Sequence, residues 1–250
     1  MKKNGSGTEI RSSRKSAFTL IEMLVVSAII SLLISLLVPV ISSVIERGKA
    51  TQCKSNLRTM AQAVSIYLVE NKGFFPPALV QSGGETQGWD FFSTGSGSNQ
   101  ELEPGWIWEE YGVNHMLQCP SFKGSDNWQG EDYTGYNYNS SYLGGMKTEM
   151  RGRVLLDVPS SNILQVKTPA STAMFGDGEY ASGANKFMRS PNPGELDAGF
   201  SGRSAGTQGF RHNGRTNVVF VDGHVESREP LIEGQTTGFL SADNELYDLE

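Results

Sequence analysis

The sequence predicts an α+β fold, in which one long N-terminal helix packs on a C-terminal antiparallel β-sheet with long loops. Residues 23–45 form an uncharged, largely apolar run, and the apolar residues after it recur with the 3.6-residue repeat of an amphipathic helix. Near the C-terminus, Asn213-Gly214 and Asp222-Gly223 are two-residue hairpin signals, since such pairs tolerate positive φ. The 29 glycines and 10 prolines favour a loop-rich fold over a helical bundle.

The uncharged run is long enough to cross a membrane. As a helix it would extend about 34 Å at about 1.5 Å per residue, and a bilayer core is about 30 Å thick. Glu22 lies inside the apolar helix, where an ionised carboxylate is expensive and is by default a functional hypothesis. The alternative is an ordinary signal anchor with one polar residue near its interfacial end.

The order of residues around Glu22 favours the functional interpretation over the ordinary signal anchor. Two basic residues, Arg14 and Lys15, precede Ala17, and Phe18-Thr-Leu-Ile-Glu22 leads into the apolar run. This string resembles the cleavage and methylation segment of type IV prepilins and of type II secretion pseudopilins. The resemblance implies that prepilin peptidase cleaves between Ala17 and Phe18 and that Phe18 is then N-methylated. Pilins usually have glycine just before the cut, where this chain has Ala17.

The resemblance also implies roles inside the helix. In those families the carboxylate at the place of Glu22 pairs with the free α-amine of a neighbouring subunit, which offsets the cost of a buried charge. Pro39 stands where pilins commonly carry a proline, and a proline inside a helix kinks it. The implied location is the inner membrane, crossed once, with the N-terminus in the cytoplasm and the head outside it. The implied partners are copies of itself, other pilin-like subunits, prepilin peptidase and a secretion or pilus assembly platform.

The helix is expected to continue beyond the membrane and to end near Gly73. Gly73 can adopt the left-handed conformation of a helix C-terminus, and two prolines follow it. The predicted organisation is a leader at 1–17, a transmembrane helix at 18–45, its amphipathic continuation at 46–72 and a loop-rich head at 73–250. The apolar face of the continuation consists of Leu57, Met60, Ala61, Val64, Tyr67 and Leu68.

Charge and composition limit the function of the head. The formal net charge is −6, and because residues 1–17 carry +4, the rest of the chain carries −10. An acidic head without a basic face argues against nucleic acid. Residues 78–150 show no sustained periodicity and are expected to form long loops with short elements. Their aromatic residues either cover a small core or form a sugar-stacking surface: Trp89, Phe91, Phe92, Trp106, Trp108 and Trp128.

The chain has two cysteines, Cys53 on the helix and Cys119 in the head. In an oxidising compartment such a pair usually closes a disulfide, which we expect here. Closing a loop of about 65 residues would stabilise the fold by about 4 kcal/mol in the chain-entropy model. Free thiols and metal binding are the alternatives, and two cysteines without local partners give metal binding little support.

The stretch GFRHNGRTNVVFVDGHVESRE resembles the signature of a pseudopilin subfamily, a histidine followed by nine residues and Asp-Gly. His212, Asp222 and His224 offer metal-ligand chemistry. Two type I′ turns, Asn213-Gly214 and Asp222-Gly223, would instead frame a strand at 215–221 in a three-strand meander. His212 and His224 would then lie about 20 Å apart. The nine-residue spacing between His212 and Asp222 would therefore reflect the length of the strand between the two turns, not the spacing of metal ligands.

A weaker metal hypothesis and an enzymatic one remain. His212 or Asp222 alone could meet Asp177, or another acidic residue from a loop, and hold a structural calcium ion; otherwise no cofactor is expected. A metal-dependent hydrolase would use the same three residues, but the chain lacks G-x-S-x-G and H-E-x-x-H and has only three histidines. We therefore expect a structural subunit, not an enzyme.

Short strands are expected at 154–156, 163–167 and 171–175.

The predicted function is a subunit of a type II secretion pseudopilus or a type IV pilus-like filament. The alternative is a monomeric membrane-anchored ectodomain that binds a ligand such as a glycan through its aromatic loops.

Overall fold

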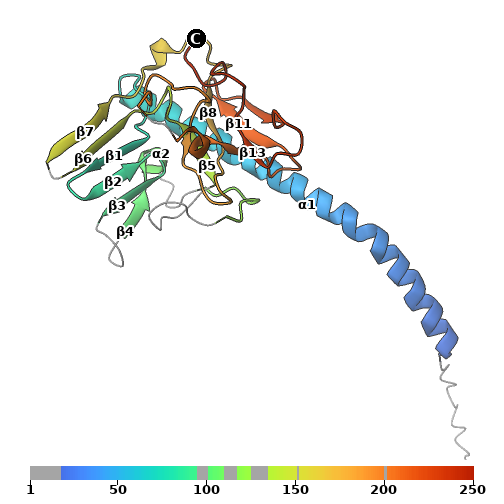
Figure 1. The fold of residues 1–250 in the computed structure, drawn as a ribbon. Coiled ribbons are helices and arrows are strands. Elements are labelled where there is room, and N and C mark those ends of the chain that lie inside the picture. The colour runs from blue at the N-terminus through green and yellow to red at the C-terminus, as the bar shows by residue number, and fades with distance from the viewer. Residues whose placement is uncertain (1–17, 95–100, 110–116, 125–134, 151, 200–201) are drawn as a thin grey trace, which may run out of the picture. The chain divides into compact units, whose positions relative to one another are not determined.

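The computed structural model describes residues 18–94, 101–109, 117–124, 135–150, 152–199 and 202–250 (Figure 1). Its contacts divide the chain into two units, Met1–Val44 and Ile45–Glu250. The helix α1, Leu20–Glu70, runs through both units. We describe each unit by itself.

In the first unit, α1 begins with a capping box. The Thr19 N–H and hydroxyl both donate to Glu22 Oε2 at 2.8 Å, and the Thr19 hydroxyl accepts from the Glu22 N–H at 3.2 Å. This reciprocal pair satisfies donors that the first helical turn otherwise leaves unpaired. The assigned helix continues through Pro39, where the kink stays a prediction.

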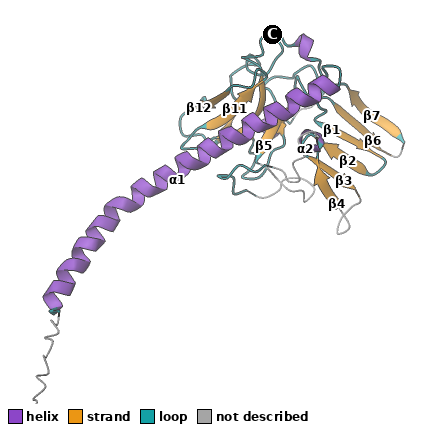
Figure 2. Cartoon of the chain, turned by 180° about the vertical axis from the view of Figure 1, so that it is seen from behind, coloured by secondary structure: helices purple, strands orange, loops and turns teal. Residues whose placement is uncertain are grey.

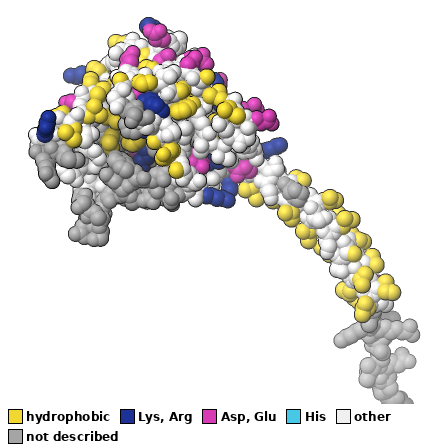
Figure 3. Space-filling view, viewed as in Figure 1, with side chains coloured by type: hydrophobic (Ala, Val, Ile, Leu, Met, Phe, Trp, Pro, Cys, Tyr) yellow, Lys and Arg dark blue, Asp and Glu magenta, His cyan; other side chains and the backbone are white. Residues whose placement is uncertain are grey.

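Beyond this cap, the first part of α1 presents apolar side chains on all sides. Its leucines, isoleucines and valines from Leu20 to Val44 are exposed, so no described residue of the chain covers them (Figure 3). By length and composition, α1 contains one segment able to cross a membrane. A helix that is apolar all round needs an apolar environment, either lipid or other helices.

In the second unit, Ile45–Glu70 of α1 packs against the β-structure of the head (Figure 2). The expected apolar face is confirmed, since Leu57, Met60, Ala61 and Val64 are buried. The end of the helix is confirmed too. Gly73 has φ +82° and donates its N–H to the Leu68 carbonyl at 2.7 Å, which closes the helix by the left-handed route open to glycine.

Two main sheets form the head. The larger has the order β4-β3-β2-β1-β6-β7 and is antiparallel except for β1 and β6. Its strands are β1 Leu79–Ser82, β2 Glu85–Gly88, β3 Phe91–Thr94, β4 Glu101–Pro104, β6 Met146–Met150 and β7 Arg153–Val158. A short helix, α2 Trp106–Glu109, follows β4.

The second sheet has the order β12-β11-β8-β5-β9 and carries the site described below. Its strands are β5 Tyr136–Asn139, β8 Ala173–Asp177, β9 Phe187–Met188, β11 Thr216–Phe220 and β12 Val225–Arg228. A separate pair, β10 Gln208–Gly209 and β13 Thr237–Gly238, lies nearby, and two 3₁₀ helices complete the described elements, η2 Ile163–Gln165 and η3 Arg203–Gly206.

Residues 78–150, which were expected to form long loops with short elements, contribute five short strands to the larger sheet and one, β5, to the second. Trp89, Phe91 and Trp108 are fully buried, so they belong to the core and cannot stack on a sugar. Phe92 and Trp106 are half-buried, and Trp128 lies outside the described residues.

Of the three expected short strands, two are present as β7 and β8, and the third is wrong. Residues 163–165 form η2, whose start is capped by the Asn162 side chain, and Leu164 points into solvent. An asparagine cap accepts hydrogen bonds from the N–H groups of the first helical turn. In a strand these N–H groups would instead donate to a neighbouring strand.

The expected meander is also corrected. Asn213-Gly214 is the expected hairpin turn, with positive φ at both residues and His212 paired to Arg215. At the second turn only Gly223 has positive φ, and Phe220, not Val221, pairs with His224. The connection is therefore a three-residue hairpin loop, in which a glycine with positive φ accommodates the one residue more than a two-residue turn contains. The neighbours of β11 are β12 and β8, because the chain before the first turn pairs with β13.

Candidate functional site

At the start of α1, the residues expected to be processed are placed only in part. Ala17 lies outside the described residues, whereas Phe18 is exposed and directly precedes the capping box. This local role of Glu22 was not predicted above, although the sequence pattern Thr19-x-x-Glu22 is that of a capping box. Both Thr19 donors use Oε2, and no described residue bonds Oε1.

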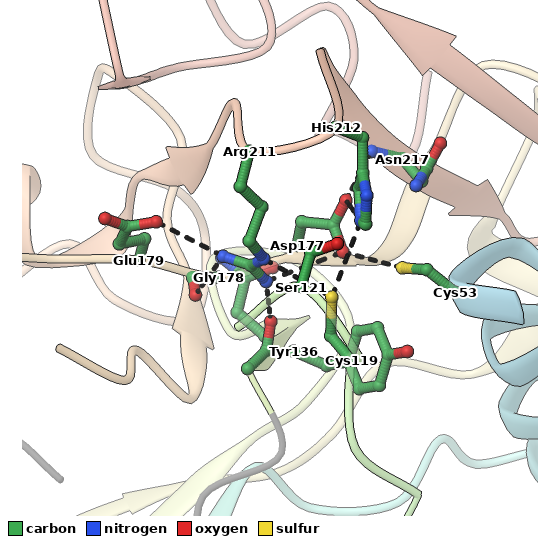
Figure 4. Close-up of polar contacts among 12 residues, drawn as sticks. Cys53, Cys119, Ser121, Tyr136, Asp177, Gly178, Glu179, Arg211, His212 and Asn217 are labelled. Carbon is green, nitrogen blue, oxygen red and sulfur yellow. Dashed lines mark hydrogen bonds and ion pairs between the residues drawn. The ribbon is translucent and has the colours of Figure 1, made fainter. Parts of the chain in front are cut away.

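In the head, four potential metal ligands converge on one point. They are Cys53 on α1, Cys119 in the loop before β5, Asp177 at the end of β8 and His212 in the turn before β11 (Figure 4). One donor atom from each lies within 4.8 Å of the others, and all four residues are buried. We call these four residues the buried cluster.

The contacts within the buried cluster are short and polar. The Cys53 thiol donates to Asp177 Oδ1 at 2.9 Å, and His212 Nε2 lies 3.3 Å from Asp177 Oδ2 and 3.5 Å from Cys119 Sγ. Both cysteines are free thiols. The structure brings them together, as the expected disulfide would require, but does not join them.

Surrounding residues hold the cluster in place. His212 Nδ1 faces Glu46 Oε1 at 3.3 Å, and the Asn217 N–H donates to Asp177 Oδ2 at 2.7 Å. Asn56 on α1 donates to the Gln118 carbonyl at 3.0 Å, which fixes the loop that carries Cys119.

Arg211 is the buried cation beside the cluster. Its Nε donates to Cys119 Sγ at 3.4 Å, its Nη2 lies 3.5 Å from Asp177 Oδ1, and its Nη1 lies 3.3 Å from Glu179 Oε2. The Asp177 carboxylate raises the pKa of this guanidinium despite burial, so Arg211 stays charged.

The same neighbours shift the ionisation of the four donors. Hydrogen bonding from Cys53, and then from His212, lowers the pKa of the Cys119 thiol to about 5 against the opposing effect of burial. Burial raises the pKa of the Cys53 thiol. Burial alone would lower the pKa of His212, but the hydrogen bond to Asp177 raises it to about 10. Arg211 outweighs burial and lowers the pKa of Asp177. Thiolate, carboxylate and imidazole chemistry therefore meet at one site.

The structure separates the other metal candidates from this site. Asp222 lies at the far turn of β11, where its Oδ1 accepts from the His224 N–H at 3.0 Å and faces His224 Nδ1 at 2.6 Å. His212 and Asp177 do meet, but Asp222 does not join them. The hydrolase constellation of all three residues is thus not assembled.

Comparison with known proteins bears on the N-terminal segment. Residues 12–38 match the family model described as the prokaryotic N-terminal methylation motif. The chain has a prepilin-type N-terminus. The motif marks pilin-like substrates of prepilin peptidase, and the match ends inside the exposed apolar part of α1. Neither a search of curated proteins nor a search of solved structures found a match.

Proposed function

We propose that this prepilin-type chain is a structural subunit of a type II secretion pseudopilus or a type IV pilus-like filament. Prepilin peptidase removes the leader at 1–17 by cutting between Ala17 and Phe18, and Phe18 is then methylated. Residues 18–45 cross the inner membrane once, with the leader in the cytoplasm and the head outside. The partners are copies of this chain, other pilin-like subunits and an assembly platform.

One observation carries the proposal: the methylation motif at 12–38 overlaps the first part of α1, whose leucines, isoleucines and valines from Leu20 to Val44 are exposed. In the membrane these side chains contact lipid. In a filament they contact the same segment of neighbouring subunits, so leaving the bilayer exchanges one apolar environment for another. The head of Ile45–Glu250 buries its own core and does not depend on this exchange.

Glu22 is the proposed assembly residue. Its Oε2 caps the helix of its own chain, while Oε1 is available for the methylated α-amine of the next subunit. A carboxylate transferred from the interface into a bundle of apolar helices is costly unless an opposite charge accompanies it. The α-amine created by cleavage supplies that charge.

The substitution Glu22→Gln separates capping from charge pairing, since glutamine at this position of a capping box retains the hydrogen bonds but not the charge. We expect the variant to be inserted and cleaved like the wild type, with at least a tenfold loss of incorporation into sheared filaments. Immunoblotting of filament and membrane fractions measures incorporation, and mass spectrometry identifies the N-terminal residue.

Thr19→Val is the matched control. It removes the hydroxyl of the cap, keeps the Glu22 charge and is expected to assemble. Wild-type incorporation of Glu22→Gln would refute charge pairing, and a mature chain that still begins at Met1 would refute the proposed function itself.

A further inference from the structure

We propose that Cys53, Cys119, Asp177 and His212 bind one divalent transition metal ion, expected to be zinc, which ties α1 to the sheet of the head. This inference is independent of the proposed function, because every residue that it uses lies in Ile45–Glu250.

Two of the distances between donor atoms are those of a tetrahedral site, and all four donors lie within 4.8 Å of one another. Zinc bonds of about 2.3 Å to sulfur and about 2.0–2.2 Å to nitrogen or oxygen place neighbouring ligands about 3.3–3.8 Å apart in a tetrahedron. The distance from Cys119 Sγ to His212 Nε2 is 3.5 Å, and that from His212 Nε2 to Asp177 Oδ2 is 3.3 Å. The Cys53 thiol donates to the other oxygen of Asp177, Oδ1, at 2.9 Å, and this hydrogen bond is lost when the sulfur gives up its proton and bonds the ion.

The supporting contacts are those of a metal site. A histidine ligand in proteins usually has its second ring nitrogen on a carboxylate or carbonyl oxygen, which fixes the orientation of the ring. Here Nδ1 of His212 faces Glu46 Oε1, and Nε2 points at the other three donors. Asp177 is oriented in the same way by the Asn217 N–H.

The charges of the buried cluster also suit a divalent ion. With both cysteines deprotonated, the two thiolates and the Asp177 carboxylate carry three negative charges, and Arg211 contributes one positive charge. A dication offsets the net negative charge that remains on these groups, beside which Glu46 and Glu179 also lie, while the protons of the Cys53 thiol and His212 pass to solvent.

The donor set selects zinc over the calcium considered from sequence. Calcium takes six to eight oxygen ligands, whereas this cluster offers two sulfurs, one imidazole nitrogen and one carboxylate. A Cys53–Cys119 disulfide would use two of the four groups and would leave His212 and Asp177 paired only with each other and with their neighbours. Metal binding uses all four.

An ion can reach the cluster from the surface. A cavity of about 280 Å³ is lined by Ser121, Phe122, Lys123, Gly124, Glu179, Ser182 and Arg211. Arg211 lines this cavity and also contacts Cys119 and Asp177, so the proposed route for the ion passes this side chain.

The test uses the full-length protein in detergent, reduced and passed through chelating resin. Titration with Co²⁺ is expected to saturate at one ion per chain, with the visible bands of tetrahedral cobalt and the near-ultraviolet bands of thiolate-to-cobalt charge transfer. Zn²⁺ is expected to displace Co²⁺ and abolish both sets of bands. Alkylation in denaturant is expected to find two thiols per chain in the zinc-loaded protein.

His212→Gln is expected to weaken Co²⁺ binding at least tenfold, whereas the matched variant His224→Gln is expected to bind like the wild type. The wild-type spectrum tests for thiolate ligands and tetrahedral geometry by itself, so the proposal is tested even if the His212 variant misfolds. Failure of the reduced wild-type protein to take up Co²⁺, or a spectrum without thiolate bands, overturns the proposal.

Discussion

Replacing Asp177 by asparagine should destabilise the metal-free head strongly. The Asp177 side chain is fully buried, and its two oxygens contact Cys53, Arg211, His212 and the Asn217 N–H. Asparagine keeps the volume but removes the negative charge, and its amide adds a donor where donors already point.

The size of the effect follows from Arg211, whose side chain is only 10% exposed. Breaking a buried ion pair by removing one partner costs about 3–5 kcal/mol. Glu179 stays 3.3 Å from the guanidinium and offsets part of the loss, so we expect the lower end, about 3 kcal/mol. For a unit of about 200 residues this corresponds to a fall in Tm of about 6–12 °C.

The assay is thermal unfolding of the full chain in detergent with EDTA, followed by near-ultraviolet circular dichroism. Asp222→Asn is the matched control, because that carboxylate is partly exposed and its loss should change stability by less than about 0.5 kcal/mol. An Asp177→Asn/Arg211→Met double variant should be less destabilised than the sum of the single variants. A Tm for Asp177→Asn within 1 °C of the wild type, or strict additivity in the double variant, would refute the reasoning.

Two further predictions concern the remainder of the head. Gly73→Ala should lower the free energy of unfolding by about 1–2 kcal/mol, since φ is +82° there, whereas Gly48→Ala in the open interior of α1 should raise it by about 0.5–1 kcal/mol. Lys186→Met should cost about 3–5 kcal/mol, because it removes the ammonium 2.6 Å from the fully buried Asp90 carboxylate. Urea unfolding measures both.

These predictions have their own controls. The two glycine variants make the same chemical change, so equal effects would contradict the conformational argument. An Asp90→Leu/Lys186→Met double variant should recover most of the stability lost in Lys186→Met, since apolar replacement of a buried pair is often close to neutral. Failure to recover would show that packing, not charge, dominates at this pair.

The sequence predicted the features that depend on local signals. The apolar run and its periodicity predicted α1, and Gly73 with the two prolines predicted where α1 ends, because each signal acts within a few residues of itself. The methylation segment was recognised for the same reason, since it is contiguous from Arg14 to Glu22.

Strand pairing could not be predicted in this way, because partners are chosen by packing between distant segments. The neighbour of β11 is β8, about forty residues earlier in the chain, and β1 pairs in parallel with β6. The local turn signal predicted the hairpin turn at Asn213-Gly214, but it did not predict which strands pair on either side of that turn. In the 78–150 region the strands are only four or five residues long, which is too short for a sustained alternation of apolar and polar residues to be recognised.

Only part of the buried cluster could be predicted from the sequence. Cys53 and Asp177 stand 124 positions apart, so no ligand spacing marks them. The weaker hypothesis, that His212 meets Asp177, agrees with the structure, but the two cysteines were considered apart from it. Glu46 and Arg211 were missed as partners, because a single charged residue near a turn or on a helix carries no signal of what it will contact.

The nine-residue spacing after His212 has a structural reason that also serves the cluster. Between the two turns lies β11, which pairs with β8 so that the Asn217 N–H reaches Asp177 at the end of that strand. The Asn213-Gly214 turn holds His212 by two backbone hydrogen bonds to Arg215 at the same end. Adding or removing one residue in β11 would turn its side chains to the opposite face of the sheet and shift this register. The length of β11, which sets the nine-residue spacing, therefore also aligns His212 with Asp177.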